Sequence, residues 1–384
     1  MAVGANRVGE VHGLLMQHLV GLARRVAAAD ALQRPCLIAG RRVGERVLVA
    51  IKPWERGLPL ESQHAAQLAQ ALGAELMLTS AVFDARVASR TDRGSKTALA
   101  ARGRLIEAER VELERLAQSL RDWGATVATR VVFQAPAYQV VLDVAREWRA
   151  DLLVVGVHER GLRLGTRLTD TDWQLMHLTP CPLLLVKDPK FDGYPTILAA
   201  VDPAHPQAAK SGVDRAVLAV ARTLASACKS ELRAVHALPE PARSPLRPVE
   251  IVPGVYCDAD AIEELHRRAV DELLASCGIA PEQVDLAPGA PAEVIAQTAA
   301  ERHAELVVIG ALRRSRLGDA ILGSTAEAVA MDVPCDVLLV PPPAPAPVEA
   351  RSRRRREARD TGKKAKPRRR AASSAALDRR PPSP

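Results

Sequence analysis

An internal duplication constrains this chain more than any other feature of its sequence. Residues 151–188 and 305–342 match without a gap at an offset of 154, which aligns Gly156 with Gly310 and Cys181 with Cys335. The upstream segments VLVAIKP (47–53) and ILAAVDP (197–203) match at an offset of 150. A period this long is not that of a solenoid repeat, so the sequence predicts a duplicated domain.

Each repeat alternates short apolar runs with amphipathic segments. The runs are rich in Val, Ile and Leu, as strands buried on both faces should be, and the segments between them show helical spacing. Gly73 and Gly124 each follow a helical segment and are suited to end it. In the first repeat we expect strands over 47–51, 75–82, 126–133, 152–155 and 183–186, and helices over 61–72, 97–123 and 137–149.

The second repeat follows the same plan. We expect strands over 197–201, 231–237, 284–287, 306–309 and 337–340, helices over 211–230, 258–277 and 291–303 with a further helix beginning at Ser324, and an extended loop over 239–253. Strands that alternate with helices indicate an α/β fold with a parallel, doubly wound sheet and right-handed crossovers. The fold class predicted is therefore two tandem doubly wound five-stranded sheets.

This reading divides the chain into five parts. An N-terminal helical extension covers 1–45, the first domain 46–188, a linker 189–195, the second domain 196–341, and a Pro/Arg/Lys-rich tail 342–384. The tail from 349 holds 14 Lys/Arg and 4 Asp/Glu, so the net charge of +8 comes from the tail and the rest of the chain is near neutral. Clustered like charge with few apolar residues predicts a disordered tail.

Several classes of function find no support in the sequence. The six cysteines and nine histidines are dispersed, without a spacing typical of zinc sites, so we expect no metal centre and no catalytic residues. Neither an apolar run long enough to span a bilayer nor a signal peptide is present, which favours a cytoplasmic protein. No Walker A, HExxH or GxSxG motif occurs, so we expect no enzymatic activity beyond, at most, slow ATP hydrolysis.

Four segments give the chain its resemblance to a known family. They are the paired strand-one segments, TDTDWQLMHLTPCPLLLVKD (169–188), VYCDA (255–259) and LGSTAEAVAMDVPCDVLLV (322–340). Over about 46–341 the chain resembles the universal stress protein family in its tandem form. The resemblance implies an adenine nucleotide alpha hydrolase-like fold with strand order 3-2-1-4-5. It also implies that the fifth strands of the two repeats pair with each other, as an intramolecular pseudo-dimer.

The resemblance also implies a nucleotide site in the second repeat. The family's nucleotide-binding members carry Gly, two residues, Gly, nine residues, Gly, then Ser or Thr. The positions that match this motif, with the residue after it, are Gly310, Arg313, Gly323, Ser324 and Thr325. The resemblance adds an acid after strand one, Asp202, and a small residue at the end of strand two, Ala237. ATP, with Mg²⁺ accompanying it, is the implied ligand. The plainer alternative is that the two glycines only form tight turns and Ser324 only caps a helix.

Arg313 departs from the motif, because a glycine is expected there. If that position needs a positive φ, a side chain costs roughly 1–2 kcal/mol, about a tenfold loss of affinity. The guanidinium could offset this loss by pairing with phosphate, or its bulk could fill the site.

The first repeat departs further from the motif. Lys52 replaces the strand-one acid, Glu159 stands opposite Arg313, and Thr169 and Asp170 replace Gly-Ser. An acid at the start of the helix repels phosphate, so we expect this repeat to serve as a scaffold.

Three functions remain open at this point. The first is a cytoplasmic stress-response protein that acts as a nucleotide-sensing or adaptor module, alone or as a homodimer. The second is a nucleic-acid-associated stress protein that binds through residues 351–370, which would make its binding strongly salt-dependent. The third is a small-molecule enzyme such as an ATP-dependent ligase, which fold alone does not establish.

Overall fold

The structure is a computed structural model. It describes residues 37–38, 41–42, 44–53, 57–91, 94–157, 168–187, 193–239, 249–252, 255–257, 259–311, 314–316 and 319–343. The described residues all belong to one compact unit, 1–343. The predicted N-terminal helix and basic tail, together with Glu159 and Arg313, lie outside the described residues.

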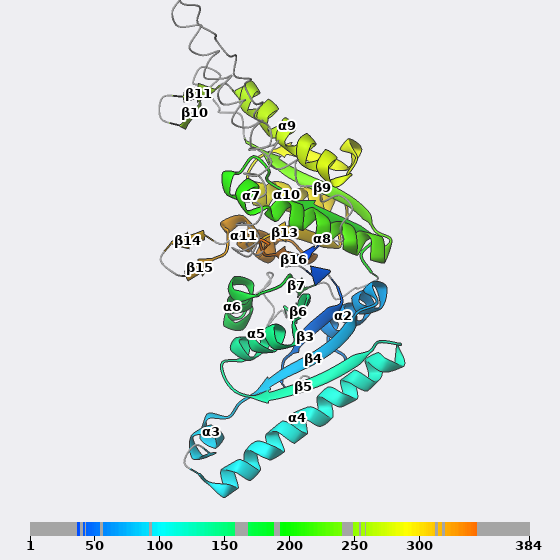
Figure 1. The fold of residues 1–384 in the computed structure, drawn as a ribbon, viewed down its shortest axis with the longest axis vertical. Helices are drawn as coiled ribbons and strands as arrows, with labels where there is room; N and C mark the ends of the chain where they lie inside the picture. The colour runs from blue at the N-terminus through cyan, green and yellow to red at the C-terminus, as the bar shows by residue number, and fades with distance from the viewer. Residues whose placement is uncertain are drawn as a thin grey trace, which may run out of the picture. The chain divides into compact units, whose positions relative to one another are not determined.

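The described part of both repeats contributes to one ten-stranded sheet with the order β12-β9-β8-β13-β16-β7-β6-β3-β4-β5 (Figure 1). Within each half the order is 3-2-1-4-5, and neighbouring strands are parallel. The halves meet where β16 and β7 pair antiparallel, with Leu338 opposite Leu184. The predicted fold class, strand order and pairing of the fifth strands are therefore confirmed.

The first repeat builds its half of the sheet from elements close to those expected. Its strands are β3 (Arg46–Ile51), β4 (Glu75–Val82), β5 (Val127–Phe133), β6 (Leu152–Gly156) and β7 (Leu183–Val186), and its helices are α2 (Leu60–Leu72), α3 (Ala85–Thr91), α4 (Lys96–Asp122), α5 (Ala137–Trp148) and α6 (Asp170–Leu178). Gly73 ends α2 with a φ of 67°, a backbone conformation that glycine adopts at little cost.

The second repeat supplies the other half. Its sheet strands are β8 (Thr196–Ala200), β9 (Glu231–Leu238), β12 (Val284–Pro288), β13 (Leu306–Gly310) and β16 (Asp336–Val340), and its helices are α7 (Pro206–Ser211), α8 (Val213–Cys228), α9 (Ala259–Cys277), η1 (Pro281–Gln283), α10 (Pro291–Glu301) and α11 (Ser324–Asp332). Short pairs outside the sheet are β1 (Leu37–Ile38) with β2 (Arg41–Arg42), β10 (Val249–Val252) with β11 (Val255–Cys257), and β14 (Arg314–Arg316) with β15 (Asp319–Ile321).

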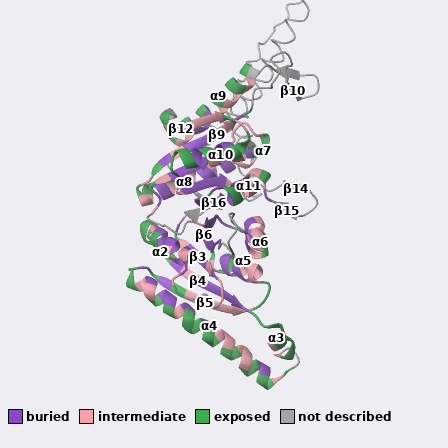
Figure 2. Cartoon of the chain, turned by 180° about the vertical axis from the view of Figure 1, so that it is seen from behind, coloured by how far each residue is buried: buried purple, intermediate pink, exposed green. Residues whose placement is uncertain are grey.

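Helices cover both faces of the sheet, and each face has its own apolar core. One core packs residues of α2, α4, α8 and α9 against alternate strand residues. The other packs residues of α5, α6, α10 and α11 against the remaining ones. The strands are buried along the middle of the sheet (Figure 2). Because aromatic residues are only 3% of the chain, Leu, Val, Ile and Ala fill most of these cores.

Two expectations for the second repeat were wrong. The single helix expected over 211–230 is two helices, α7 and α8, because Gly212 has a φ of 71° and ends α7. Pro206 occupies the first turn of α7, where its missing N–H costs nothing. The loop expected over 239–253 contains β10, which pairs with β11.

A buried polar cluster joins the two repeats beside the β16–β7 seam. The fully buried carboxylate of Asp336 accepts hydrogen bonds from the Tyr194 hydroxyl at 2.6 Å and the Lys187 backbone N–H at 2.8 Å. It also lies 2.8 Å from Nδ1 of His64, which is on α2 of the first repeat. Burial leaves such polar groups few other partners, so these bonds hold the linker and the first repeat against β16.

Candidate functional site

The candidate site lies at the carboxyl edge of the second repeat's half-sheet. β8 and β13 are adjacent, with Ala200 opposite Ile309, so Asp202 and Gly310 both follow the last paired residues. α11 connects β13 to the parallel strand β16 and must therefore begin at the same edge. Open α/β sheets bind ligands at this edge, where the chain reverses its strand order.

The N-terminus of α11 has no side-chain cap. Gly323 occupies the N-cap position with φ −67° and ψ 139°, and no side-chain hydrogen bond caps the helix. The following Ser324 is exposed and Thr325 is half-buried. The first N–H groups of a helix have no partner within it and carry partial positive charge, so an uncapped N-terminus favours an anion.

The matching helix of the first repeat is capped by its own side chains. Thr169 accepts a hydrogen bond from the backbone N–H of Asp172, and the Asp172 carboxylate accepts from the backbone N–H and hydroxyl of Thr169. Asp170 adds a second acid in this first turn. The capping box satisfies the start of this helix, and the two acids in its first turn disfavour an anion there.

A lysine bridges the corresponding strand ends of the first repeat. Lys52, which follows β3, donates from Nζ to the carbonyl of Gly156 at the end of β6, at 3.1 Å. The second repeat carries Asp202 in place of Lys52. The side chain at this position therefore ties the two strands together in one repeat, whereas in the other it is a half-exposed carboxylate.

Gly310 has a packing role that is independent of any ligand. A Cβ atom at this position would lie 2.8 Å from Cγ2 of Val213, the first residue of α8. Real Cβ atoms do not approach other atoms so closely, so glycine lets α8 begin directly against β13.

A buried acid lies beneath Asp202. Oδ1 of Asp214 accepts a hydrogen bond from the backbone N–H of Asp202 at 3.1 Å. The pKa of Asp214 is raised to about 6, chiefly by burial; the hydrogen bond from the Asp202 backbone N–H lowers it, and the nearby Asp202 carboxylate raises it. The start of α8 thereby fixes the backbone from which the Asp202 side chain projects.

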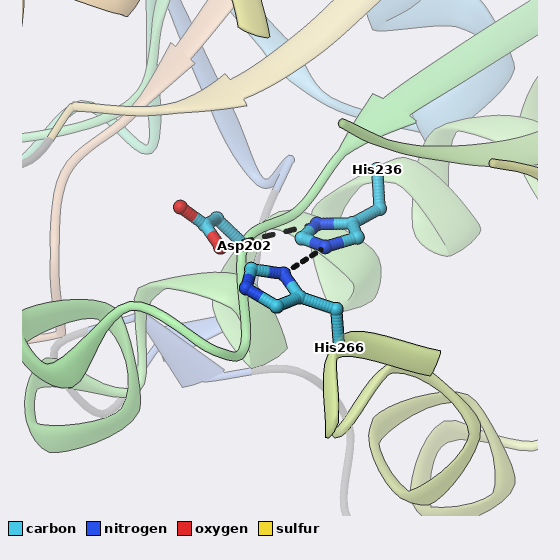
Figure 3. Close-up of side chains that lie close together, drawn as sticks. All are labelled: Asp202, His236 and His266. Carbon is cyan, nitrogen blue, oxygen red and sulfur yellow. Dashed lines mark hydrogen bonds and ion pairs between the residues drawn. The ribbon is translucent and has the colours of Figure 1, made fainter. Parts of the chain in front are cut away.

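Two histidines that the sequence analysis did not select lie beside Asp202 (Figure 3). His236 on β9 is 2% exposed, and its Nε2 lies 2.8 Å from Nδ1 of His266 on α9. Nδ1 of His236 lies 3.9 Å from Oδ1 of Asp202. Asp202 and His236 are 34 residues apart, and His236 and His266 are 30 apart, so no local motif could reveal them. The signal that could is a histidine between the apolar Val235 and Ala237 near the end of a strand.

The structure places most of the predicted nucleotide-site residues near this carboxyl edge: Asp202 just after β8, Ala237 on β9, Gly310 at the end of β13, and Gly323, Ser324 and Thr325 at the start of α11. Ala237 is half-buried on β9 and packs with the apolar core that includes α11. Arg313 lies outside the described residues, so its effect stays a prediction. None of the described helices is long and apolar enough to cross a membrane.

Comparisons with known proteins agree with this architecture. The universal stress protein family matches residues 45–187 and again 193–341. Universal stress protein E from Escherichia coli and that from Salmonella typhi are each 26% identical over 300 residues, which cover 78% of this chain and 94% of the relative.

Solved structures extend the agreement to the fold. A universal stress protein structure from Pseudomonas aeruginosa superposes with a TM-score of 0.59 at 26% identity, covering 78% of this chain and 93% of that chain. A universal stress protein structure from Archaeoglobus fulgidus superposes with a TM-score of 0.55 at 16% identity, covering 78% of this chain and 98% of that chain. At this low identity the match supports only the fold. The duplicated sheet, the paired fifth strands and the two family matches together show that this chain belongs to the universal stress protein family.

Proposed function

We propose that this chain is a stress-response protein whose second repeat binds an adenine nucleotide, ATP with its Mg²⁺, and whose first repeat is the scaffold. The observation that carries the proposal is the uncapped N-terminus of α11 at the sheet edge that also bears Asp202. The matching edge of the first repeat is closed by its capping box and by Lys52.

Each residue of the second repeat has a distinct role in this proposal. The N–H groups of Ser324 and Thr325 would donate to phosphate oxygens, with the helix dipole favouring their charge. The Asp202 carboxylate would accept hydrogen bonds from ribose hydroxyls. Ala237 would leave space beside the base because it has only a methyl group. Mg²⁺ would arrive with the nucleotide and neutralise phosphate charge.

The proposed role is sensing or adaptation rather than fast chemistry. Among the residues proposed to touch the nucleotide, none pairs a nucleophile with a general base in the manner that rapid hydrolysis needs. Bound and free forms would differ at the start of α11, and a partner could read that difference. Cytoplasmic location and a homodimer built on the paired repeats remain predictions that accompany this role.

Native mass spectrometry of the full-length protein with titrated Mg-ATP tests the proposal. Gly323→Asp places a carboxylate at the start of α11 and should remove the bound nucleotide. Thr169→Asp is the matched control, because it changes the corresponding cap of α6 and should leave binding unchanged. Absence of a nucleotide complex at millimolar ATP, or equal binding by Gly323→Asp, would overturn the proposal and leave an adaptor whose glycines only form turns.

The charge of the tail favours a second candidate, a nucleic-acid-associated protein that binds through residues 351–370. Residues 349–384 carry 14 of the chain's 53 Lys/Arg. Phosphate contacts release counterions, so retention on DNA should fall steeply as salt rises. Deletion of residues 350–384 should abolish retention at low salt; retention that survives the deletion would contradict this candidate.

A further inference from the structure

Three potential metal ligands meet from three separate elements beside the carboxyl edge of the second repeat. Asp202 follows β8, His236 lies on β9 and His266 lies on α9 (Figure 3). Each offers one ligand atom, and these atoms all lie within 4.8 Å of one another. We propose that Asp202, His236 and His266 form a binding site for a divalent transition metal ion, with Zn²⁺ as the representative ligand.

The ring of His236 is oriented as metal-binding histidines are. Its Nδ1 lies 2.9 Å from the backbone carbonyl oxygen of Val201, which can only accept a hydrogen bond. The proton of the neutral ring must therefore reside on Nδ1, which leaves the lone pair of Nε2 directed toward His266. A backbone carbonyl that fixes the tautomer in this way is a recurrent feature of zinc sites.

His266 presents its own nitrogen to the same point. Its Nδ1 lies 2.8 Å from Nε2 of His236, so in the metal-free protein one proton lies between the two nitrogens. Two nitrogens that share a tetrahedral Zn²⁺ at about 2.1 Å lie about 3.4 Å apart, so the half-buried His266 would have to rotate slightly away from His236 to admit the ion.

Asp202 completes the set with a negative charge. Its side chain is 50% exposed and can turn, while its backbone is held by Asp214. Two imidazoles and one carboxylate leave a fourth position open for water or another ligand, the arrangement of tetrahedral zinc sites with an exchangeable ligand. Nitrogen and oxygen ligands of this kind suit Zn²⁺ and Co²⁺ better than they suit Mg²⁺, which prefers oxygen alone.

The proposed metal site is distinct from the nucleotide site except at Asp202. Successive side chains of a strand point to opposite faces, so His236 and Ala237 lie on opposite faces of β9. Ala237 packs with the core formed by α10 and α11, whereas His266 comes from α9 on the other face. The metal proposal can therefore be tested without nucleotide, and its failure would leave the proposed function standing.

Isothermal titration of Zn²⁺ into the nucleotide-free, full-length protein tests the inference, with Co²⁺ absorption as a second readout. His266→Ala removes a ligand from a helix that tolerates alanine. Asp202→Asn removes the charge with little change of shape. His303→Asn is the matched control, because His303 is exposed, lies outside the cluster and has a φ of 51° that asparagine tolerates. Thermal unfolding of each variant confirms that it is folded.

We expect a Zn²⁺ site that His266→Ala weakens more than about 100-fold, beyond the 10–100-fold typical of changes next to a ligand. Asp202→Asn should weaken it as well, and His303→Asn should leave it unchanged. Co²⁺ should show tetrahedral absorption without a thiolate charge-transfer band. Equal Zn²⁺ affinity in the wild type and His266→Ala, no binding in the wild type, or a thiolate band would overturn the proposal.

Discussion

The two repeats share a fold but differ at the carboxyl edge of the sheet. In the first repeat Thr169 and Asp172 satisfy the start of α6, and Lys52 bonds to the carbonyl of Gly156. In the second repeat α11 begins without a side-chain cap, and a half-exposed carboxylate stands where Lys52 would be. The comparison teaches that a duplicated domain can keep its core while one copy closes this edge of the sheet with its own side chains and the other does not.

The largest expected effect is that of replacing Asp336, the first residue of β16, a position at which the two repeats also differ. At the offset of 154 Asp336 corresponds to Pro182, and only Asp336 accepts bonds from Tyr194 and Lys187. Asp336→Ala should lower the free energy of unfolding by about 3–5 kcal/mol, because it leaves the buried partners of the carboxylate unsatisfied. Urea unfolding measures this; a loss below 1 kcal/mol would show that the cluster does not hold the repeats together.

The buried acid beneath Asp202 predicts a pH-dependent effect. The pKa of Asp214 is raised to about 6 in the folded chain from 3.8, so its ionised form disfavours folding. This cost is absent below pH 3.8 and complete above pH 6. Asp214→Asn, which keeps an acceptor for the Asp202 N–H, should therefore raise the free energy of unfolding by about 2–3 kcal/mol at pH 7.5 and by much less at pH 4. Urea unfolding at both pH values measures this gain. An equal change in the free energy of unfolding at the two pH values would contradict a raised pKa for Asp214.

A third prediction separates packing from ligand binding at Gly310. Gly310→Ala should cost about 1–3 kcal/mol of unfolding free energy, because its Cβ meets Val213 at 2.8 Å. Val213→Ala removes the methyl groups in the way, so the double variant should lose less than the sum of the single losses. Strict additivity in this double-mutant cycle would show that the two residues do not interact.

The smallest expected effect compares the two helix starts directly. Thr169→Ala should cost about 0.5–2 kcal/mol, because it removes one half of a capping box. Ser324→Ala should change the free energy of unfolding by less than about 0.5 kcal/mol, as is usual for an exposed side chain that makes no cap. Thermal or urea unfolding of both variants checks the difference; equal losses would mean that α11 is capped too.

The sequence predicted the strands and the duplicated α/β fold because these signals were local and repeated, whereas the strand order came from the family resemblance. The strands Glu75–Val82 and Leu183–Val186 have the bounds that the sequence predicted. The pairing of β16 with β7 was implied by the family resemblance and supported by two apolar edge strands in one chain, each of which needs cover. Its antiparallel direction was not predicted. The break at Gly212 was missed because helical spacing continues across it, although a glycine after Pro206 and Ser211 was a warning.

The candidate site could be predicted only in part. Asp202, Gly310 and Gly323 were indicated by the family motif, and the strand order that the resemblance implies puts them at strand or helix ends, where open α/β sheets bind ligands. The pairing of His236 with His266 depends on how α9 packs against β9, and no sequence spacing encodes that contact. The close approach of Val213 to Gly310 likewise depends on how α8 packs against β13. It means that packing alone requires a glycine at this position.

Hydrogen–deuterium exchange of the full-length protein, with and without saturating Mg-ATP, tests the central claim most directly. The account predicts slower exchange for the first-turn N–H groups of α11, whose partners would be phosphate oxygens, and for the segment that follows β8. It predicts no change in the first turn of α6, where Thr169 and Asp172 already satisfy the backbone. Protection of α6, or no protection in either repeat, would contradict the claim that the second repeat alone binds the nucleotide.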